Sequence, residues 1–509
     1  MIRDLAGLAA TAHDLVVVGG GIYGACIAWD ATLRGLRVAL VERDDFGGAT
    51  SANSLRIVHG GLRYLARADL RRMRESIRER SALLRIAPTL VEPLPVLIPT
   101  GGHGTRSRLV MAAALRLNDA LSLDRNQALD PAHCIPSGRR VSPEECRRLF
   151  PGFPSAGTSG GALWYDARVT HPERLTLAFL QAAAGRGAAV ANHCEVERVL
   201  VRGGAAEGVV ARDRLTGSTL EIRGRAVVLA AGPWTPELGG GDPARLPSAF
   251  ALNLELAGRL AETAIGIQTL SGPEEDPVIG GGRHIFLNPQ TRTTLLGTWY
   301  CLPEARSPTE LAARGAAALL GEIRAACPAL HLDATDVVGY QWGWLPLKAG
   351  REPGRLTALA ERGRVIDHGA AGGPRGMFSV EGTKLTTARN VAEQAIDRVV
   401  ASLGHQADPC RTAHERLDEV ADPVITVTDP VITLEARVRR AIRDEMAATL
   451  PDVFRRLTPG GRPDAPADLA AVAQAAALEL GWTEQRKDSE IEAVKRNIGP
   501  PGAAPERVA

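Results

Sequence analysis

The chain has 509 residues, with 60 lysine and arginine residues against 58 aspartate and glutamate residues, so its formal net charge is +2. This balance excludes a strongly basic nucleic-acid-binding protein and an acidic disordered chain. Hydrophobic residues make up 45% of the chain and charged residues 23%, as in ordinary globular proteins, and the length allows two or three domains. The seven cysteines are far apart in the sequence, so we expect reduced thiols in the cytoplasm, with no disulfide framework and no metal site.

The N-terminal region reads as a nucleotide-binding unit. The apolar run 14–18 predicts a buried strand, and it leads directly into the glycine-rich sequence GGGIYG (residues 19–24). A helix is expected from about 22 to 34, followed by a second strand at 36–41. That strand ends at Glu42, where a carboxylate can accept hydrogen bonds from the ribose of an adenosine.

Each glycine of the loop has an expected task. Gly19 makes the tight turn, Gly21 lets backbone N–H groups approach a pyrophosphate, and Gly24 lets the helix pack closely on the strand. The order of strand, glycines, helix, strand and acid predicts dinucleotide binding. It does not by itself separate FAD from NAD, although the acid at Glu42 argues against the 2′-phosphate of NADP.

Further along the chain, helices and strands are predicted in separate blocks. The Arg-rich stretch 62–85 and the apolar stretch 106–117, which has basic ends, predict helices. Short alternating strands are expected at 192–200, 208–212 and 218–223, and hairpin strands at 283–287 and 293–298. After a proline-bearing linker, 434–450 and 467–480 have the pattern of amphipathic helices.

Several motifs resemble one family. The stretch ATSANSLRIVHGGLRYL (residues 49–65) resembles the ATSxxSSKLIHGGLRYL sequence of FAD-dependent, respiratory-type glycerol-3-phosphate dehydrogenases, members of the D-amino-acid oxidase superfamily. VVLAAGPW (227–234) and SVEGTKLTT (379–387) resemble the strand and NATGPW turn and the SVFGGKLTT segment of that family. RHIFL (283–287) with LLGT (295–298) resembles its RIVFxxP…IIGTTD hairpin, and the tail is similar to its helical C-terminal domain.

The resemblance implies an α/β chain, α+β overall, with a Rossmann-like FAD-binding domain, an antiparallel-sheet substrate domain and an all-helical C-terminal domain. We expect a discontinuous FAD-binding domain at 1–95, 170–250 and 340–405, a substrate domain at 96–169 and 251–339, a linker at 406–430 and the helical domain at 431–500.

The implied cofactor is FAD. Hydroxyl and amide side chains after the glycine loop would supply donors for phosphates and for the polar edge of a flavin, although such a loop can also merely cap a helix. A helix start after Gly382 would stabilise negative charge on a reduced flavin, or be an ordinary helix start. The expected cofactor-binding residues are Gly19, Gly21, Gly24, Glu42, Thr50, Ser51, Asn53, Ser54, Val196, Gly232, Gly382, Thr383, Leu385 and Thr386.

The resemblance also implies a substrate site. Arg63 would bind a phosphate or carboxylate through its guanidinium group, and Lys384, one of four lysines in the chain, would lie near the flavin and the substrate. His59 is a candidate general base, with a flavin-orienting hydrogen bond as an equal alternative. The expected catalytic residues are therefore His59, Arg63 and Lys384, and the expected substrate-binding residues are Arg63, Tyr64, Arg283 and Lys384.

The substrate pocket departs from the family pattern. Leu345 stands in GWLPL, where the family has GVRPL with a phosphate-binding arginine. Arg283 or Lys348 could supply the missing cation. We also expect four aromatic residues near the pocket, which would suit a larger or less polar substrate: Trp299, Tyr300, Trp342 and Trp344.

Three functions remain open at this point. The first is oxidation of sn-glycerol-3-phosphate in glycerol metabolism, with electrons passed to a quinone. The second is oxidation of another alcohol, amine or polyol phosphate, with oxygen as a further acceptor, and the third is a non-catalytic flavin-binding partner. We expect a cytoplasmic protein, with homodimer formation open. The helices at 62–85 and 106–117 either contact the inner face of the cytoplasmic membrane or form a solvated basic face over a packed core.

Overall fold

The computed structural model describes the greater part of the chain, namely residues 1–101, 107–153, 158–239, 248–269, 284–302, 307–348, 358–360, 362–417, 432–461 and 466–498. The chain divides into two compact units. The first comprises Met1–Ala52, His171–Pro247 and Ala360–Ile498, and the second comprises Asn53–Thr170 and Ser248–Leu359. In the ranges given above, no helix is both long and apolar enough to cross a bilayer.

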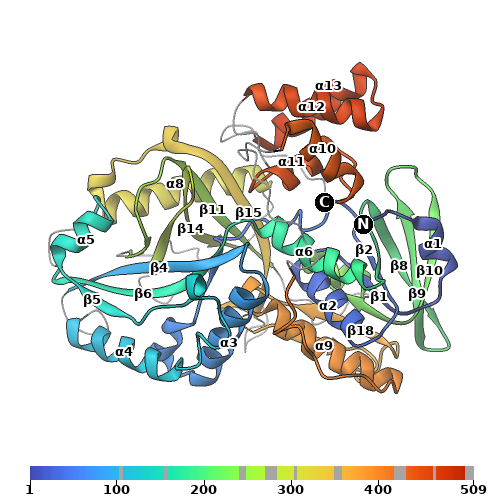
Figure 1. Cartoon of the computed structure of the whole chain (residues 1–509), viewed down its shortest axis with the longest axis horizontal. Coiled ribbons are helices and arrows are strands. Elements are labelled where there is room, and N and C mark those ends of the chain that lie inside the picture. Colours follow the sequence, from blue (N-terminus) through green and yellow to red (C-terminus); the bar gives the residue numbers. More distant parts are fainter. Residues whose placement is uncertain are drawn as a thin grey trace. The chain divides into compact units, whose positions relative to one another are not determined.

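The first unit is built on a parallel sheet (Figure 1). Its strands follow the order β17 (Arg364–Asp367), β18 (Met377–Glu381), β10 (Thr219–Leu229), β1 (His13–Val18), β2 (Val38–Val41) and β7 (Ala189–Ala191). All these pairings are parallel except the β17–β18 pair. Strand β2 and residues 15–18 of β1 are apolar and buried, because both faces of the sheet are covered there.

Different layers cover the two faces. Helices α2 (Ile22–Leu33), α6 (Pro172–Gly185) and α9 (Ala388–Leu403) pack together on one side. On the other side, α1 (Leu5–Ala10) and the antiparallel strands β8 (Cys194–Arg202) and β9 (Ala205–Asp213) share an apolar cluster with Val16 and Val18 of β1. Strand β10 joins the two layers, since its first half pairs with β9 and its second half with β1.

The C-terminal helices belong to the same unit. They are α10 (Leu434–Arg443), α11 (Leu450–Leu457), α12 (Pro466–Leu480) and α13 (Glu484–Ile498), and they enclose an apolar cluster of their own. The single helix predicted at 434–450 is wrong in extent. The first helix ends at Arg443 with Asp444 as its C-cap, Met446 beyond it has a left-handed φ of 59°, and a capping box between Thr449 and Asp452 begins α11.

The second unit is built on a larger, mostly antiparallel sheet. In order, its strands are β16 (Ala358–Leu359), β15 (Val337–Lys348), β11 (Ser248–Ala257), β14 (Thr293–Cys301), β13 (His284–Pro289), β12 (Ala264–Gln268), β4 (Val91–Thr100), β6 (Gly160–Val169) and β3 (Ile57–Val58), with β5 (Arg139–Val141) beside β6. Only β12 and β4, among these described pairs, run parallel.

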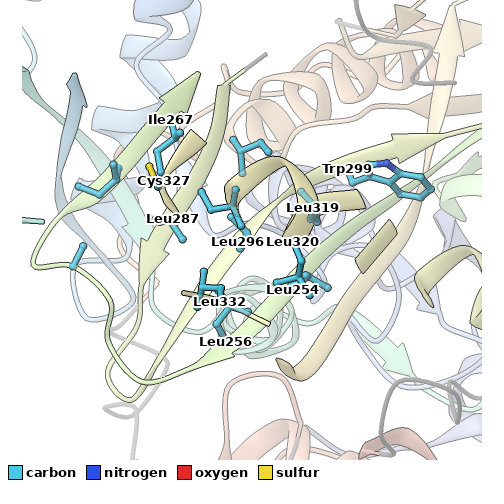
Figure 2. Close-up of a cluster of buried hydrophobic side chains, with 14 of the residues drawn as sticks. Leu254, Leu256, Ile267, Leu287, Leu296, Trp299, Leu319, Leu320, Cys327 and Leu332 are labelled. Atoms are coloured by element: carbon cyan, nitrogen blue, oxygen red, sulfur yellow. The ribbon is translucent and has the colours of Figure 1, made fainter. Parts of the chain in front are cut away.

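Helix α8 (Pro308–Ala326) covers one face of this sheet. Figure 2 shows Leu254 and Leu256 of β11, Leu296 of β14 and Leu319 and Leu320 of α8 within one buried cluster. Because β-strand side chains alternate between faces, the residues between these leucines face the opposite side of the sheet. That opposite face carries polar groups.

Shorter helices complete the second unit. They are α3 (Leu70–Ile86), α4 (Arg108–Leu121), α5 (Pro143–Leu149) and a 3₁₀ turn at Leu62–Arg67. The helix predicted at 62–85 is interrupted, because Ala68 has a φ of 53° and the Asp69 side chain caps α3 by accepting from the backbone of Arg72. Arg106, at the expected start of the next helix, lies outside the described residues.

The predicted fold class is confirmed: a parallel nucleotide-binding sheet, an antiparallel sheet and C-terminal helices are all present. The two units differ from the expected domain boundaries. Residues 53–95 fall in the second unit because β3 and β4 pair with β6, and 340–359 fall there because β15 pairs with β11. The predicted helical domain is not separate from the first unit.

Candidate functional site

The glycine loop of the first unit packs closely against neighbouring backbone. Gly19 has a φ of 109°, and a Cβ there would lie 2.6 Å from the backbone oxygen of Ala230. A Cβ at Gly24 would lie 1.9 Å from the carbonyl oxygen of Gly19, so only glycine lets helix α2 start this close to the loop. Gly21 is the N-cap of α2, where backbone N–H groups and the helix dipole favour an anion.

Glu42 closes this loop from the end of β2. Its carboxylate accepts hydrogen bonds from the backbone N–H groups of Gly20 (2.7 Å) and Asp44 (2.9 Å). Burial raises the pKa of Glu42, and these two hydrogen bonds oppose the rise. Each carboxylate oxygen retains acceptor capacity beyond one N–H bond, so a ribose hydroxyl can still donate to it.

The segment after Glu42 returns to the glycine loop. The backbone N–H of Gly47 donates to the Gly20 carbonyl oxygen (3.0 Å), and the Ser51 hydroxyl accepts from the backbone N–H of Ile22, the first residue of α2 (3.0 Å). Thr50 lies in the same turn, which is half-buried. The expected cofactor residues Thr50 and Ser51 therefore lie beside the glycine loop, although they are far from it in sequence.

The glycine loop also contacts the segment that carries Lys384. The Tyr23 hydroxyl donates to the Lys384 carbonyl oxygen (2.9 Å) and accepts from the Lys384 backbone N–H (3.3 Å). A Cβ at Gly382 would lie 2.0 Å from that hydroxyl, so Gly382 provides the space that Tyr23 occupies. Lys384 is the N-cap of the turn Leu385–Thr387, which leads into α9.

The remaining candidates of the first unit are spread more widely. Thr383 donates its hydroxyl hydrogen to the Ala360 carbonyl oxygen (2.8 Å), and Thr386 is buried. Gly232, with a φ of 59°, follows the carboxyl end of β10, a central strand of the parallel sheet. Val196 is buried in the apolar cluster on β8, so a contact with a cofactor falls to its backbone.

The second unit contains the HGGLRYL loop. Gly61 has a φ of 84° and lies against the ring of Tyr64, which is buried. The His59 ring meets the Tyr64 ring edge-on at 5.8 Å. Arg63 is exposed, and its guanidinium donates to the Tyr64 hydroxyl (3.3 Å), so the loop presents a cation beside a phenol.

A buried ion pair holds this loop in place. Asp166 of β6 accepts a hydrogen bond from the backbone N–H of Gly60 (2.6 Å) and pairs with Arg80 of α3 (3.1 Å). The Trp164 indole N–H donates to the other carboxylate oxygen (3.3 Å). Burial lowers the pKa of Arg80, whereas the charge of Asp166 opposes this. Asp166 thus links the loop to both a strand and a helix.

Amide side chains hold the neighbouring segment, which includes Asn53 and Ser54. Asn253 of β11 donates to the Asn53 carbonyl oxygen (3.4 Å), and Asn288 of β13 donates to the Leu55 carbonyl oxygen (2.8 Å). The Ser54 hydroxyl accepts from the backbone N–H of Arg56 (3.2 Å). These bonds attach the segment to the polar face of the large sheet.

The expected aromatic pocket is wrong for three of its four members. Trp299 is buried in the cluster under α8, and Trp342 and Trp344 pack on Phe250 at ring distances of 5.6 and 5.3 Å. Strand alternation explains the error, because these three side chains share the face that α8 covers. Tyr300 lies at the opposite phase of β14. The aromatic residues therefore give no support for a larger substrate.

The missing phosphate-binding arginine remains a departure. Leu345 lies on β15 at the same strand phase as Gln341, so it faces the polar side of the sheet. Arg56 reaches that side, but it is buried and donates to Gln290 (3.1 Å). Arg283 and the side chain of Lys348, which we expected as replacement cations, lie outside the described residues.

Sequence reasoning missed Tyr23, Asp166 and Arg80. Tyr23 lies inside the glycine motif, so its position could have drawn attention to it. Nothing in the sequence pairs Asp166 with Arg80, because the pair depends on β6 lying next to α3.

Comparisons with known proteins identify relatives along most of the chain. The model of a family described as FAD dependent oxidoreductase matches residues 14–398. A glycerol-3-phosphate dehydrogenase of Synechocystis is 31% identical over 440 residues, which cover 82% of this chain and 75% of the relative. The human mitochondrial glycerol-3-phosphate dehydrogenase is 29% identical, and the match covers 78% of this chain but only 54% of the human protein.

A solved structure supports the same fold. The X-ray structure of the glycerol-3-phosphate dehydrogenase from Bacillus halodurans, complexed with FAD, superposes with a TM-score of 0.72. The superposition covers 99% of this chain and 98% of the other, at 23% sequence identity. The glycine loop, in which added Cβ atoms would collide with the backbone, is of the kind that a dinucleotide requires.

Proposed function

Because this chain belongs to the FAD dependent oxidoreductase family, whose cofactor is FAD, we propose that it oxidises sn-glycerol-3-phosphate to dihydroxyacetone phosphate. The observation that carries this substrate is the HGGLRYL loop, where Arg63 is exposed beside Tyr64. The names of the relatives agree with this proposal. A guanidinium group binds a phosphate through two parallel hydrogen bonds.

We assign each side chain of the site a separate role in the reaction. Bound FAD would supply the acceptor for the hydride of the secondary alcohol. Arg63 binds the substrate phosphate, and Lys384 places a positive charge near the reacting end. His59 takes the hydroxyl proton, or alternatively orients the cofactor by a hydrogen bond. Tyr23 fixes the backbone of Lys384, and Asp166 fixes the loop that carries His59.

Anaerobic reduction of the flavin tests the substrate. The purified yellow protein is mixed with sn-glycerol-3-phosphate alone, and the loss of the oxidised-flavin absorption band is followed by stopped flow. We expect fast bleaching at millimolar or lower substrate. A bound flavin that stays oxidised would contradict the proposed substrate while leaving the family assignment intact.

A different alcohol or amine is the second candidate, and Leu345 is the observation that favours it. Removing one cation from a phosphate site lowers affinity, since a charge-assisted hydrogen bond contributes about 1.5–3 kcal/mol. If glycerol reduces the flavin as efficiently as sn-glycerol-3-phosphate does, the phosphate is not recognised and this second candidate holds. A third function, flavin binding without turnover, would require that none of these compounds bleach the protein.

The electron acceptor that we propose is a membrane quinone. Helix α4 supports this proposal, because Leu109 is 78% exposed and Val110 and Leu117 are each 46% exposed on its surface. Arg108 and Arg116 are exposed on the same helix, so apolar and basic groups occur together, as on helices that lie on anionic lipid. The proposal of a membrane quinone requires neither oxygen as the electron acceptor nor a homodimer.

Vesicle binding tests the membrane contact. Leu117→Glu should reduce co-sedimentation with vesicles of phosphatidylglycerol and phosphatidylcholine about tenfold, because a buried leucine contributes about 1.5–3 kcal/mol. Leu478→Glu is the matched control, since Leu478 of α12 is 76% exposed and lies outside α4. Equal binding by both variants would contradict a membrane role for α4.

A further inference from the structure

A buried ion pair connects the cofactor segment to the C-terminal helices. We refer to residues 43–52, which follow Glu42, as the cofactor segment. Its Asp45 accepts two hydrogen bonds from the guanidinium of Arg456 on α11, at 2.7 and 2.8 Å. Asp45 is 1% exposed and Arg456 is 2% exposed. The two residues are separated by 411 positions in the sequence.

Further contacts surround this ion pair and hold Asp45 in place. The Asn192 amide donates both to the Asp45 carboxylate (3.1 Å) and to the backbone oxygen of Met446 (2.8 Å). The guanidinium of Arg455 lies 3.7 Å from Asp45, and a Cβ at Gly48 would lie 3.3 Å from that guanidinium carbon. The cofactor segment is therefore packed against α11 at two positions.

A second ion pair joins the same surfaces. The His193 ring lies 2.8 Å from the carboxylate of Asp452 on α11, and the His193 backbone N–H donates to the Asp44 carbonyl oxygen (2.8 Å). Arg174 of α6 pairs with Glu445 (2.5 Å), which precedes α11. The docking of α11 thus depends on several charged contacts around the cofactor segment.

The other side of the cofactor segment forms the nucleotide loop. Gly47 bonds to Gly20, and Ser51 bonds to the first N–H of α2. The segment is thus held between the glycine loop and Arg456. Removing one partner of a buried ion pair leaves an unpaired charge, which is strongly unfavourable, so the segment would have to rearrange if Arg456 were lost.

We propose that Arg456 positions the cofactor segment for FAD, so that the C-terminal helical region is a working part of the cofactor site. A C-terminal domain that is separate from the FAD-binding domain would have no role of this kind. The proposal depends on FAD binding, which the family establishes, and does not depend on the identity of the substrate. Its failure therefore leaves the proposed oxidation of sn-glycerol-3-phosphate untouched.

The dissociation constant of FAD tests the proposal. Full-length Arg456→Met apoprotein is titrated with FAD, and binding is followed by flavin fluorescence. We expect the dissociation constant to rise about tenfold or more, which corresponds to about 1.4 kcal/mol. Adding Asp45→Asn to this variant removes the unpaired charge, so thermal stability should recover while FAD affinity stays low.

Glu490→Gln is the matched control. The Glu490 carboxylate is buried among the C-terminal helices, where it accepts from the Leu450 backbone N–H (2.9 Å), and it does not contact the cofactor segment. We expect this variant to lose stability without a change in FAD affinity. If Glu490→Gln weakens FAD binding as much as Arg456→Met does, Arg456 acts only through stability and the proposal is wrong.

Hydrogen exchange on the unmodified chain decides the question if Arg456→Met does not fold. Because coupling between two sites is reciprocal, FAD should slow amide exchange in α11 if α11 stabilises the FAD site. Full-length apoprotein and FAD-loaded protein are compared by mass spectrometry, with α13 as the internal reference. Slower exchange in α11 supports the proposal, and equal exchange in both states overturns it.

Discussion

Replacing Asp166 by asparagine should lower the stability of the second unit and also slow flavin reduction in the protein that remains folded. Asp166 is 6% exposed and its partner Arg80 is 1% exposed. Breaking a buried ion pair by removing one partner costs about 3–5 kcal/mol, a large share of the about 5–15 kcal/mol that stabilises a typical protein. The amide cannot accept at both former carboxylate oxygens, so the Gly60 N–H also loses its partner in one amide orientation.

The kinetic effect follows from the position of Gly60 next to His59. With a looser loop, we expect slower anaerobic flavin reduction by sn-glycerol-3-phosphate and a higher KM, measured well below the unfolding midpoint. The flavin content should stay near that of the unmodified protein, because the glycine loop and Glu42 belong to the other unit. Denaturant unfolding of the same preparation gives the stability change.

The pair formed by Glu92 and Arg168 is a matched control. It joins β4 to β6 at directly opposed residues, whereas Asp166 and Arg80 join β6 to α3, and its side chains are 42% and 23% exposed. A pair this accessible contributes about 1 kcal/mol or less, so Glu92→Gln should change neither stability nor reduction much. The reasoning is refuted if Asp166→Asn costs no more stability than Glu92→Gln, or if its reduction kinetics are unchanged in folded protein.

Three further outcomes are expected. Arg63→Ala should retain its flavin, raise KM and lower kcat/KM for sn-glycerol-3-phosphate; flavin loss would assign Arg63 a structural role. Tyr23→Phe removes two hydrogen bonds to the Lys384 backbone and should slow flavin reduction about tenfold at normal flavin content, whereas an unchanged rate would contradict the positioning role. Burial would lower the pKa of His193, but Asp452 outweighs burial and raises it. The pairing of His193 with Asp452 therefore stabilises the fold fully below about pH 6.5, and this stabilisation is lost as the pH rises through the folded-state pKa of His193. Over that pH range, the thermal stability should fall less steeply in His193→Gln than in the unmodified chain. Identical pH profiles of the two proteins would contradict this prediction.

The local elements of the nucleotide loop could be predicted from the sequence. A strand, a glycine turn and a helix are specified by residues within one short stretch, and the left-handed φ of Gly19 follows from that turn. The expectation that Thr50 and Ser51 lie near the loop came from the family resemblance. Propensity alone could not have placed them there, since Ser51 meets Ile22 across 29 positions.

The pairing of distant strands could not be predicted in the same way. Strand β3 is two residues long and β4 contains three prolines, so nothing in their sequences identifies β6 as their partner or predicts that residues 53–95 group with the second unit. The aromatic residues failed for a related reason. The alternation of side chains along a strand shows which residues share a face of the sheet, but it does not show which face α8 covers. Trp299 and Trp342 lie on the face that α8 covers.

The charged residues that hold the site in place are a separate class. Asp45 and Asp166 are each bound to an arginine from a distant element, Arg456 and Arg80 respectively. A sequence motif contains the residues that bind the ligand, because the ligand determines their spacing. A charged residue that holds the site in place needs only to contact its partner in the folded chain, so its position follows no motif. Substitutions at such anchors should therefore alter FAD or substrate binding although no motif contains them, which is the result that the Arg456 and Asp166 variants are designed to detect.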